Sequence, residues 1–186
     1  MRRLFAERLV LATAVIVILM SALFAYLRVA SGQIVSEART SSLKGPNGHV
    51  LGEVMVTGAP NGVILRVQVR GLPPGWHGMH LHEKADCGDS AFKGSGGHIH
   101  AGTPVVHGIL NADFDDAGDL PNLYVNADGT ATVELYSTLV TLPHGDKRPA
   151  LLDDDGSALV IHANPDDYKS QPIGGAGERI ACAPIQ

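Results

Sequence analysis

The chain has 186 residues, a formal net charge of −5 at pH 7 and a hydrophobic content of 45%. This length is sufficient for one domain with its own hydrophobic core. The first 31 residues contain four arginines and one glutamate, a net charge of +3, so residues 32–186 carry −8. A domain with this negative charge repels nucleic acid and anionic membrane surfaces, and we therefore expect no nucleic-acid partner.

The N-terminal segment, residues 1–31, has the pattern of a signal peptide or a signal anchor. Three arginines precede an apolar run over residues 9–27, and Arg28 ends that run. A cationic head followed by an apolar stretch directs export, and the run is about long enough to span a bilayer. Two outcomes stay open: cleavage after Ser31, or retention with residues 9–27 as an inner-membrane anchor. Either one places the domain in the periplasm or another extracytoplasmic compartment.

Residues 32–47 are polar and are expected to form a linker, so the folded domain is expected over residues 48–186. Alternating or valine-rich runs separated by Gly, Pro and Asn turns indicate short strands. These runs cover residues 48–58, 62–71, 130–142 and 157–163. No segment after residue 31 has a convincing helical period. Short strands at this spacing favour an all-β antiparallel sandwich or barrel.

Two long segments, residues 83–121 and 164–177, interrupt the strand pattern. Both contain polar residues that can bind metals. Long loops in a compact β domain usually carry function. We therefore expect two long functional loops.

The histidines are the most informative residues of the chain. His80 and His82 are separated by one residue, and alternate residues on a strand point to the same face. A second pair, His98 and His100, follows, with further histidines downstream that include His107 and His162. Imidazole nitrogens suit copper and zinc better than magnesium or calcium. The pattern predicts a metal site.

Cys87 and Cys182 are the two cysteines of the chain. In an exported protein an even number of cysteines favours a disulfide. Two buried free thiols are the alternative.

Five sequence blocks, in order, resemble the copper/zinc superoxide dismutases, in particular the exported bacterial ones. They are GWHGMHLHEKADC, GGHIHAG, HG…AGDLPNL, ALVIHANPDDY and GGAGERIAC, within residues 48–186. The resemblance implies an eight-stranded antiparallel Greek-key β-barrel with two long loops. It also implies an oxidoreductase that disproportionates superoxide, with a copper ion and a zinc ion as cofactors.

The same resemblance implies a role for each matching residue. The copper ligands are His80, His82, His98 and His162, and His98 also bridges to zinc. Zinc is further bound by His107 and Asp119, while Asp166 links ligands of both metals by hydrogen bonds. Arg179 lies beside the copper and guides the anionic substrate, so it and the bridging His98 are the candidate catalytic residues. Cys87 and Cys182 match the family disulfide.

Two positions depart from the family pattern. The family has a third zinc histidine three residues before the zinc aspartate, where this chain has Asp116. A carboxylate is an acceptable zinc ligand, so Asp116 is expected to complete a site of two histidines and two aspartates. The alternative is that Asp116 belongs to a solvated acidic loop. His100 replaces the usual Asn or Asp, either as a substitute ligand or as a loop residue facing solvent.

Two other functions stay open at this point. The domain could be a non-catalytic copper-binding or copper-delivery module of the same fold, or a copper-only dismutase with an empty second site. The retained copper ligands and Arg179 favour the enzyme, because a storage protein has no use for an anion guide. A homodimer is left open.

Overall fold

The computed structural model describes residues 13–26, 37–143 and 147–186. The chain divides into two compact units, Met1–Val35 and Ser36–Gln186. In the first unit, residues 13–26 are helical and exposed. Among the residues that the structure describes, no helix combines the length and apolar character needed to cross a bilayer. The expected signal segment lies partly outside the described residues, as does the cleavage position after Ser31.

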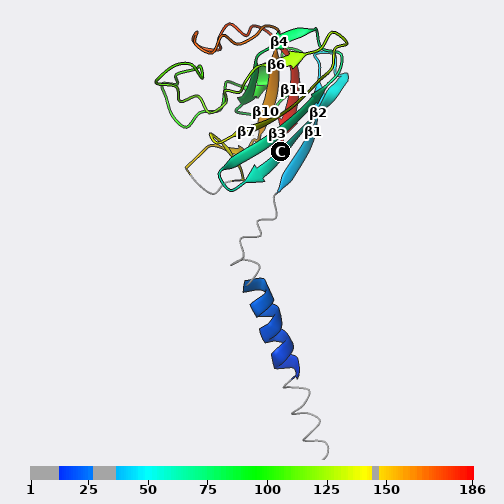
Figure 1. Ribbon diagram of the computed structural model, residues 1–186, viewed down its shortest axis with the longest axis vertical. Helices are drawn as coiled ribbons and strands as arrows, with labels where there is room; N and C mark the ends of the chain where they lie inside the picture. The colour runs from blue at the N-terminus through cyan, green and yellow to red at the C-terminus, as the bar shows by residue number, and fades with distance from the viewer. Residues whose placement is uncertain (1–12, 27–36, 144–146) are drawn as a thin grey trace, which may run out of the picture. The chain divides into compact units, whose positions relative to one another are not determined.

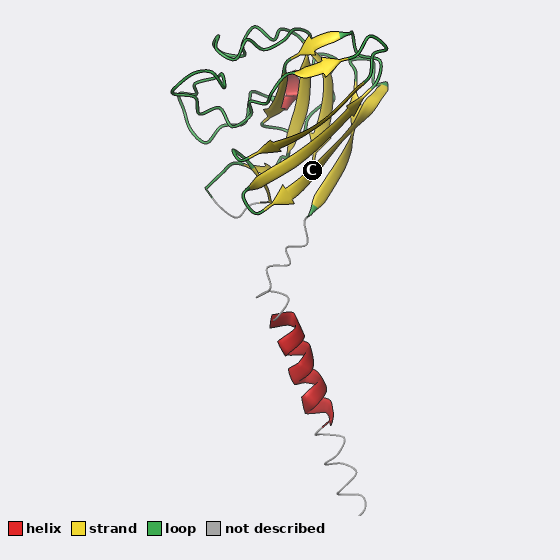
Figure 2. Cartoon of the chain, in the orientation of Figure 1, coloured by secondary structure: helices red, strands yellow, loops and turns green. Residues whose placement is uncertain are grey.

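The second unit is built mainly of β-strands and long loops (Figures 1 and 2). Its main sheet has the strand order β5-β10-β11-β1-β2-β3-β7, and every pairing in it is antiparallel. The members are β1 (Ala38–Lys44), β2 (Val50–Ala59), β3 (Gly62–Val69), β5 (Met79–His82), β7 (Ala131–Ser137), β10 (Ser157–His162) and β11 (Arg179–Ile185). The expected all-β antiparallel barrel class is confirmed.

Two short sheets complete the unit. One pairs β4 (Gly75–His77) with β6 (Leu123–Val125), and the other pairs β8 (Thr141–Pro143) with β9 (Ala150–Leu152) in parallel. The described strands therefore form one sheet of seven and two of two, instead of eight in a single barrel. The run expected over residues 130–142 is divided between β7 and β8.

Strand β1 lies inside the segment that was expected to be a linker, residues 32–47. It pairs with β2 along its length, from Ala38 opposite Thr57 to Lys44 opposite Val50. Within β1 only Leu43 is fully buried. A strand is held by backbone hydrogen bonds, which do not depend on the side chains. A strand whose side chains are mostly exposed therefore shows little hydrophobic alternation in its sequence.

The core lies inside the curled sheet. In β3 the residues Val63, Leu65 and Val67 are buried and alternate with exposed side chains, as the sequence pattern predicts. Strand β10 is different because all six of its residues are buried. A strand covered on both faces is well suited to hold a buried polar group at its end, and His162 occupies that end.

The disulfide between Cys87 and Cys182 is confirmed. It joins the loop after β5 to β11 and packs against Phe92 and Val160. It closes a loop of 95 residues, which corresponds to about 4–5 kcal/mol in the chain-entropy description. The loop that contains His98 is thereby tied to the sheet.

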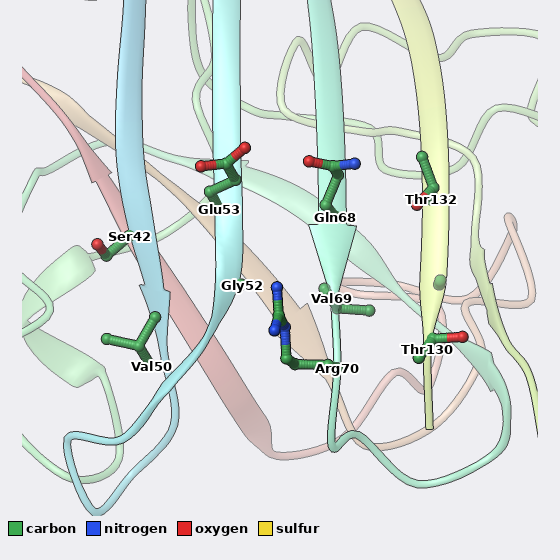
Figure 3. A pocket seen from close by; sticks show the side chains of 10 residues that line it. Ser42, Val50, Gly52, Glu53, Gln68, Val69, Arg70, Thr130 and Thr132 are labelled. Carbon is green, nitrogen blue, oxygen red and sulfur yellow. The ribbon is translucent and has the colours of Figure 1, made fainter. Parts of the chain in front are cut away.

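The outer face of the sheet is polar. Ser42, Glu53, Gln68 and Thr132 are successive partners across four strands and line a hollow of about 700 Å³ (Figure 3). None of the histidines that the structure describes lines this hollow. The candidate chemistry is therefore elsewhere, where the two long loops meet β5 and β10.

Candidate metal centre

Four histidines meet where the edge of the sheet contacts the first long loop. His80 and His82 lie on β5, which pairs with β10, and His162 ends β10. The register of β10 against β11 shifts between Ile161 and His162. His98 lies opposite His82 through an isolated β-bridge. Each of the four offers a ring nitrogen, and these nitrogens lie within 4.8 Å of one another.

The free nitrogens of this cluster identify the donor atoms. Among described buried side chains, four atoms have no hydrogen-bond partner: His80 Nδ1, His82 Nε2, His98 Nε2 and His162 Nε2. A buried polar atom without a partner is costly, and native structures have few of them. Four converging nitrogens fit a transition-metal ion bound at about 2 Å. Copper therefore fits this donor set.

The opposite ring nitrogens orient three of these rings. His82 Nδ1 lies 3.0 Å from the carbonyl oxygen of Gly96, and His162 Nδ1 lies 3.0 Å from that of Gly177. His80 is reversed, because its Nε2 lies 3.0 Å from Asp166 Oδ2. A carbonyl oxygen can only accept a hydrogen bond, so Nδ1–H donates in His82 and His162 and Nε2 keeps its lone pair.

A second cluster lies on the other side of His98. His98 Nδ1 is 2.8 Å from Asp116 Oδ2 and 3.4 Å from Asp119 Oδ1. His107 Nδ1 is 2.7 Å from Asp119 Oδ1 and 3.5 Å from Asp116 Oδ2. Ligands of a tetrahedral zinc ion lie about 3.3 Å apart when the bonds are 2.0–2.1 Å. Two nitrogens and two carboxylate oxygens at these separations fit zinc.

A wider grouping of potential ligands places His80 with His98, His107 and Asp119. We place His80 with the first cluster, because its Nε2 is engaged by Asp166 and its Nδ1 is the free atom.

Asp116 is buried, and its two carboxylate oxygens have different partners. Oδ1 accepts a hydrogen bond from the Gly118 amide, and Oδ2 lies beside the two histidines.

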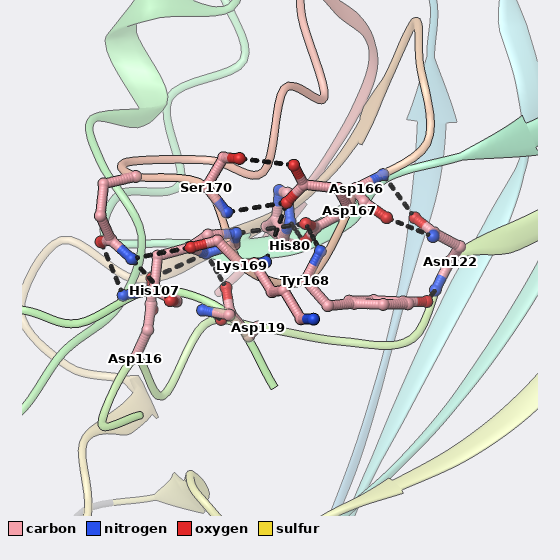
Figure 4. A network of polar contacts seen from close by, with 12 residues as sticks. His80, His107, Asp116, Asp119, Asn122, Asp166, Asp167, Tyr168, Lys169 and Ser170 are labelled. Carbon is pink, nitrogen blue, oxygen red and sulfur yellow. Dashed lines mark hydrogen bonds and ion pairs between the residues drawn. The ribbon is translucent and has the colours of Figure 1, made fainter. Parts of the chain in front are cut away.

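Asp166 joins the two clusters (Figure 4). Its Oδ2 contacts His80 Nε2, and its Oδ1 lies 3.2 Å from His107 Nε2. The Asn122 side chain holds the backbone of Asp166 with two hydrogen bonds of 2.9 Å each. The Gln171 side chain holds the backbone of His107 likewise, at 2.8 and 3.0 Å. Asn122 and Gln171 were missed in the sequence, because backbone-directed amides have no motif.

Burial lowers the pKa values of three histidines of the first cluster, His80, His82 and His162. The pKa of His82 falls to about 2 and that of His162 to about 3, because desolvation disfavours the charged ring. Burial also lowers the pKa of His80, although Asp166 opposes the change. The free nitrogens of His80, His82 and His162 are therefore unprotonated at neutral pH, as metal ligation requires.

The second cluster has the opposite electrostatics. Burial opposes the charged form of His107, but hydrogen bonds to Asp116, Asp119 and Asp166 raise its pKa to about 11. The same competition raises the pKa of His98. The pKa values of Asp116 and Asp119 are lowered by the two histidines, against desolvation. Without metal, protons hold this cluster together, and a cation must displace them.

A cavity of about 320 Å³ leads to the first cluster. Its wall includes His82, His98, His162 and Arg179. The Arg179 guanidinium donates from Nη1 to the Phe92 carbonyl and from Nη2 to the Gly96 carbonyl, both at 2.6 Å. A partly buried guanidinium in a cavity beside four histidines can attract and dock a small anion.

Comparison with known proteins identifies the family. A family model described as copper/zinc superoxide dismutase matches residues 50–185. The chain belongs to the copper/zinc superoxide dismutase family. It is 55% identical over 147 residues to a Cu-Zn superoxide dismutase of Caulobacter vibrioides, covering 79% of this chain and 84% of that protein. A Cu-Zn superoxide dismutase of Aquifex aeolicus is 40% identical over 140 residues, with 75% and 81% covered.

Solved structures agree with this family. A superoxide dismutase-like protein from Bacillus subtilis matches with a TM-score of 0.74 and 33% identity, over 79% of this chain and 97% of that one. The Cu/Zn superoxide dismutase from Brucella abortus matches with a TM-score of 0.63 and 28% identity, over 81% and 100%.

His100, the second departure from the family pattern, lies outside the two donor clusters. Its Nδ1 is 3.0 Å from the His98 carbonyl oxygen, and the ring is half-buried at the wall of the same cavity. In this position it borders the access route to the first cluster.

Proposed function

We propose that this chain disproportionates superoxide to dioxygen and hydrogen peroxide at copper held by four histidines, with zinc on the other side of His98. The observation that carries the assignment is the set of four unpartnered nitrogens, from His80, His82, His98 and His162. This member of the copper/zinc superoxide dismutase family is an oxidoreductase acting on superoxide, and its cofactors are copper and zinc.

When bound, copper supplies the one-electron redox change that oxidises one superoxide and, with two protons, reduces a second, while zinc supplies charge without redox change. The protein provides donor atoms, orientation and proton transfer. His80 would bind through Nδ1, and the other three histidines would bind through Nε2. His98 Nε2 can bind either copper or a proton, and a proton held there could be delivered to the reduced product, because His98 Nδ1 faces the second cluster.

For zinc we propose four ligands: His98 Nδ1, His107 Nδ1, Asp116 Oδ2 and Asp119 Oδ1. Support comes from the four separations of 2.7 to 3.5 Å between nitrogens and oxygens. Asp166 positions His80 and His107 from behind. Asp116 then replaces the family histidine with a carboxylate and adds one negative charge to the site.

Arg179 is proposed to guide the substrate. Superoxide is an anion, whereas residues 32–186 carry −8. A permanently charged guanidinium in the cavity wall supplies local positive potential where the substrate must arrive. A copper-storage or copper-delivery module would gain nothing from this arrangement, so the alternative function is not favoured.

We also propose that the domain is exported, either cleaved after residue 31 or anchored by residues 9–27. The arginine-flanked apolar run and the disulfide support an extracytoplasmic location. Membrane fractionation with N-terminal sequencing distinguishes cleavage from anchoring. A homodimer remains a proposal, and sedimentation of the domain tests it.

The test of function uses the purified domain. Superoxide consumption is measured as isolated, after chelation, and after addition of copper and zinc separately and together. We expect loss on chelation and recovery that requires copper. Copper uptake without superoxide consumption would instead support the binding module.

A further inference from the structure

Ser95 lies between the proposed anion guide and a proposed copper ligand. It ends the short 3₁₀ helix η1 (Lys93–Ser95) and is fully buried. Its hydroxyl donates to the Phe92 carbonyl oxygen at 2.8 Å. The Ser95 hydroxyl oxygen lies 3.1 Å from Arg179 Nη1 and 3.4 Å from His82 Nδ1. No motif in the sequence marks this residue.

The hydrogen-bonding capacity of this hydroxyl is used completely. A serine hydroxyl has one donor and two acceptor lone pairs. Here the donor serves Phe92, and the acceptors face the N–H groups of Arg179 and His82. The Gly96 carbonyl is shared in the same way, because it lies 2.6 Å from Arg179 Nη2 and 3.0 Å from His82 Nδ1. The Arg179 guanidinium and the His82 imidazole are therefore both held by hydrogen bonds to the same short loop segment, residues 92–96.

We propose that Ser95 is a positioning residue that holds Arg179 over the access cavity and fixes the orientation of the His82 ring. The proposal rests on the proposed function, in which Arg179 docks the anion and His82 binds copper through Nε2. Without the hydroxyl, Arg179 Nη1 keeps only the Phe92 carbonyl, and the guanidinium can rotate about its remaining contacts. His82 keeps the Gly96 carbonyl and loses its longer contact.

A purely structural role would have a different signature. The bond from Ser95 to Phe92 is local, spanning three residues, and would stabilise η1 alone. Ser157 supplies a matched control, because it is also buried and donates to one carbonyl, that of Leu151, at 2.9 Å. Ser157→Ala deletes an equivalent buried hydroxyl without touching Arg179 or His82.

The first experiment needs no copper. Nitrogen-15 NMR of the metal-free protein records the Arg179 guanidinium and the His82 ring in wild type, Ser95→Ala and Ser157→Ala. We expect shifted or exchange-broadened Arg179 signals and a shifted His82 Nδ1 in Ser95→Ala alone. Unchanged signals at both side chains would overturn the proposal, even if the variant is less stable.

The second experiment uses azide as an anionic probe on the copper- and zinc-loaded enzyme. We expect Ser95→Ala to weaken azide binding and lower the superoxide rate constant about threefold to tenfold, the size of one hydrogen bond. Copper content and Ser157→Ala values should match wild type. In an Arg179→Ala background, Ser95→Ala should add little, because the residue acts through Arg179.

An equal loss of azide affinity in both backgrounds would contradict action through Arg179. Failure of the proposed function is separable from failure of this inference. Wild-type protein that binds no copper or consumes no superoxide overturns the function, while the metal-free NMR result still decides the role of Ser95.

Discussion

At the scale of single residues, the free ring nitrogen differs among the histidines of the first cluster. His80 leaves Nδ1 free, whereas His82 and His162 leave Nε2 free. The histidines themselves could be predicted from motif spacing. Which nitrogen is free could not, because it depends on the Asp166 carboxylate and on loop carbonyls that are distant in sequence.

His162→Ala should abolish copper binding at the first cluster and superoxide consumption, because one of four donors is lost. The barrel should remain folded, since β10 retains its apolar core contacts. Copper content, circular dichroism and superoxide decay check this, with the exposed His49→Ala as control. A His162→Ala variant with full activity would refute the copper assignment.

Asp116→Ala should weaken zinc binding, because it removes a charged oxygen donor. Asp116→His restores the ligand type of the family and should bind zinc at least as tightly. Competition with a zinc chelator measures both variants, and exposed Asp113→Ala supplies the control. Unchanged affinity in Asp116→Ala would make Asp116 an ordinary loop charge and leave three protein ligands.

The metal-free protein should be most stable near pH 6.5. In the folded protein His82 and His162 have pKa values of about 2 and about 3, so they stay unprotonated below pH 6.5. The same histidines bind protons in the unfolded chain, and the free energy of unfolding therefore falls as pH drops. Above pH 6.5, folded His107 retains a proton up to about pH 11 that the unfolded chain has lost, so the free energy falls as pH rises.

Urea titrations with chelator present measure this profile. His107→Gln should weaken the alkaline decline and leave the acid decline in place. Stability that rises steadily from pH 6.5 toward alkaline pH would contradict the protonated state of the second cluster.

At the scale of elements, the strands with clear alternation were predictable and β1 was not. Strand β3 alternates apolar and polar residues, and its predicted run, residues 62–71, contains the observed strand. Strand β1 has one fully buried residue, Leu43, and is recognised only through its pairing with β2. The long loops were predictable as functional. Their internal contacts, such as Gln171 on the His107 backbone, join residues 64 apart.

Cys182→Ser should lower the free energy of unfolding by about 4 kcal/mol, because the 95-residue loop is no longer closed. The loop that contains Phe92 should also become more mobile, which should weaken the hydrogen bonds that hold Arg179. Denaturant unfolding and limited proteolysis measure the two effects. Reduced wild-type protein should behave like the variant, and a difference between them would point to a defect other than loop closure.

At the scale of the whole molecule, the charge of −8 on residues 32–186 opposes the approach of an anionic substrate. The cavity must therefore reverse the potential locally, and Arg179 is the charge in its wall that can do so. Composition predicted this conflict, and the family resemblance supplied its solution. The position of the guanidinium between two loop carbonyls required the structure.

Arg179→Glu should strongly lower the second-order rate constant, because the local potential becomes repulsive. Added salt should then raise the remaining rate, whereas it should lower the wild-type rate. Stopped-flow superoxide decay across ionic strength measures both, and Arg179→Lys should show an intermediate loss. A glutamate variant with the wild-type rate and salt dependence would reduce Arg179 to an ordinary surface charge.

Two metals are proposed to occupy adjacent clusters that share His98. Anomalous diffraction at the copper and zinc absorption edges, from crystals of the loaded domain, tests this proposal most directly. We expect copper at about 2 Å from His80 Nδ1 and from Nε2 of His82 and His162. We expect zinc beside His107, Asp116 and Asp119. Copper absent from the first cluster, or zinc without the Asp116 carboxylate among its ligands, would contradict it.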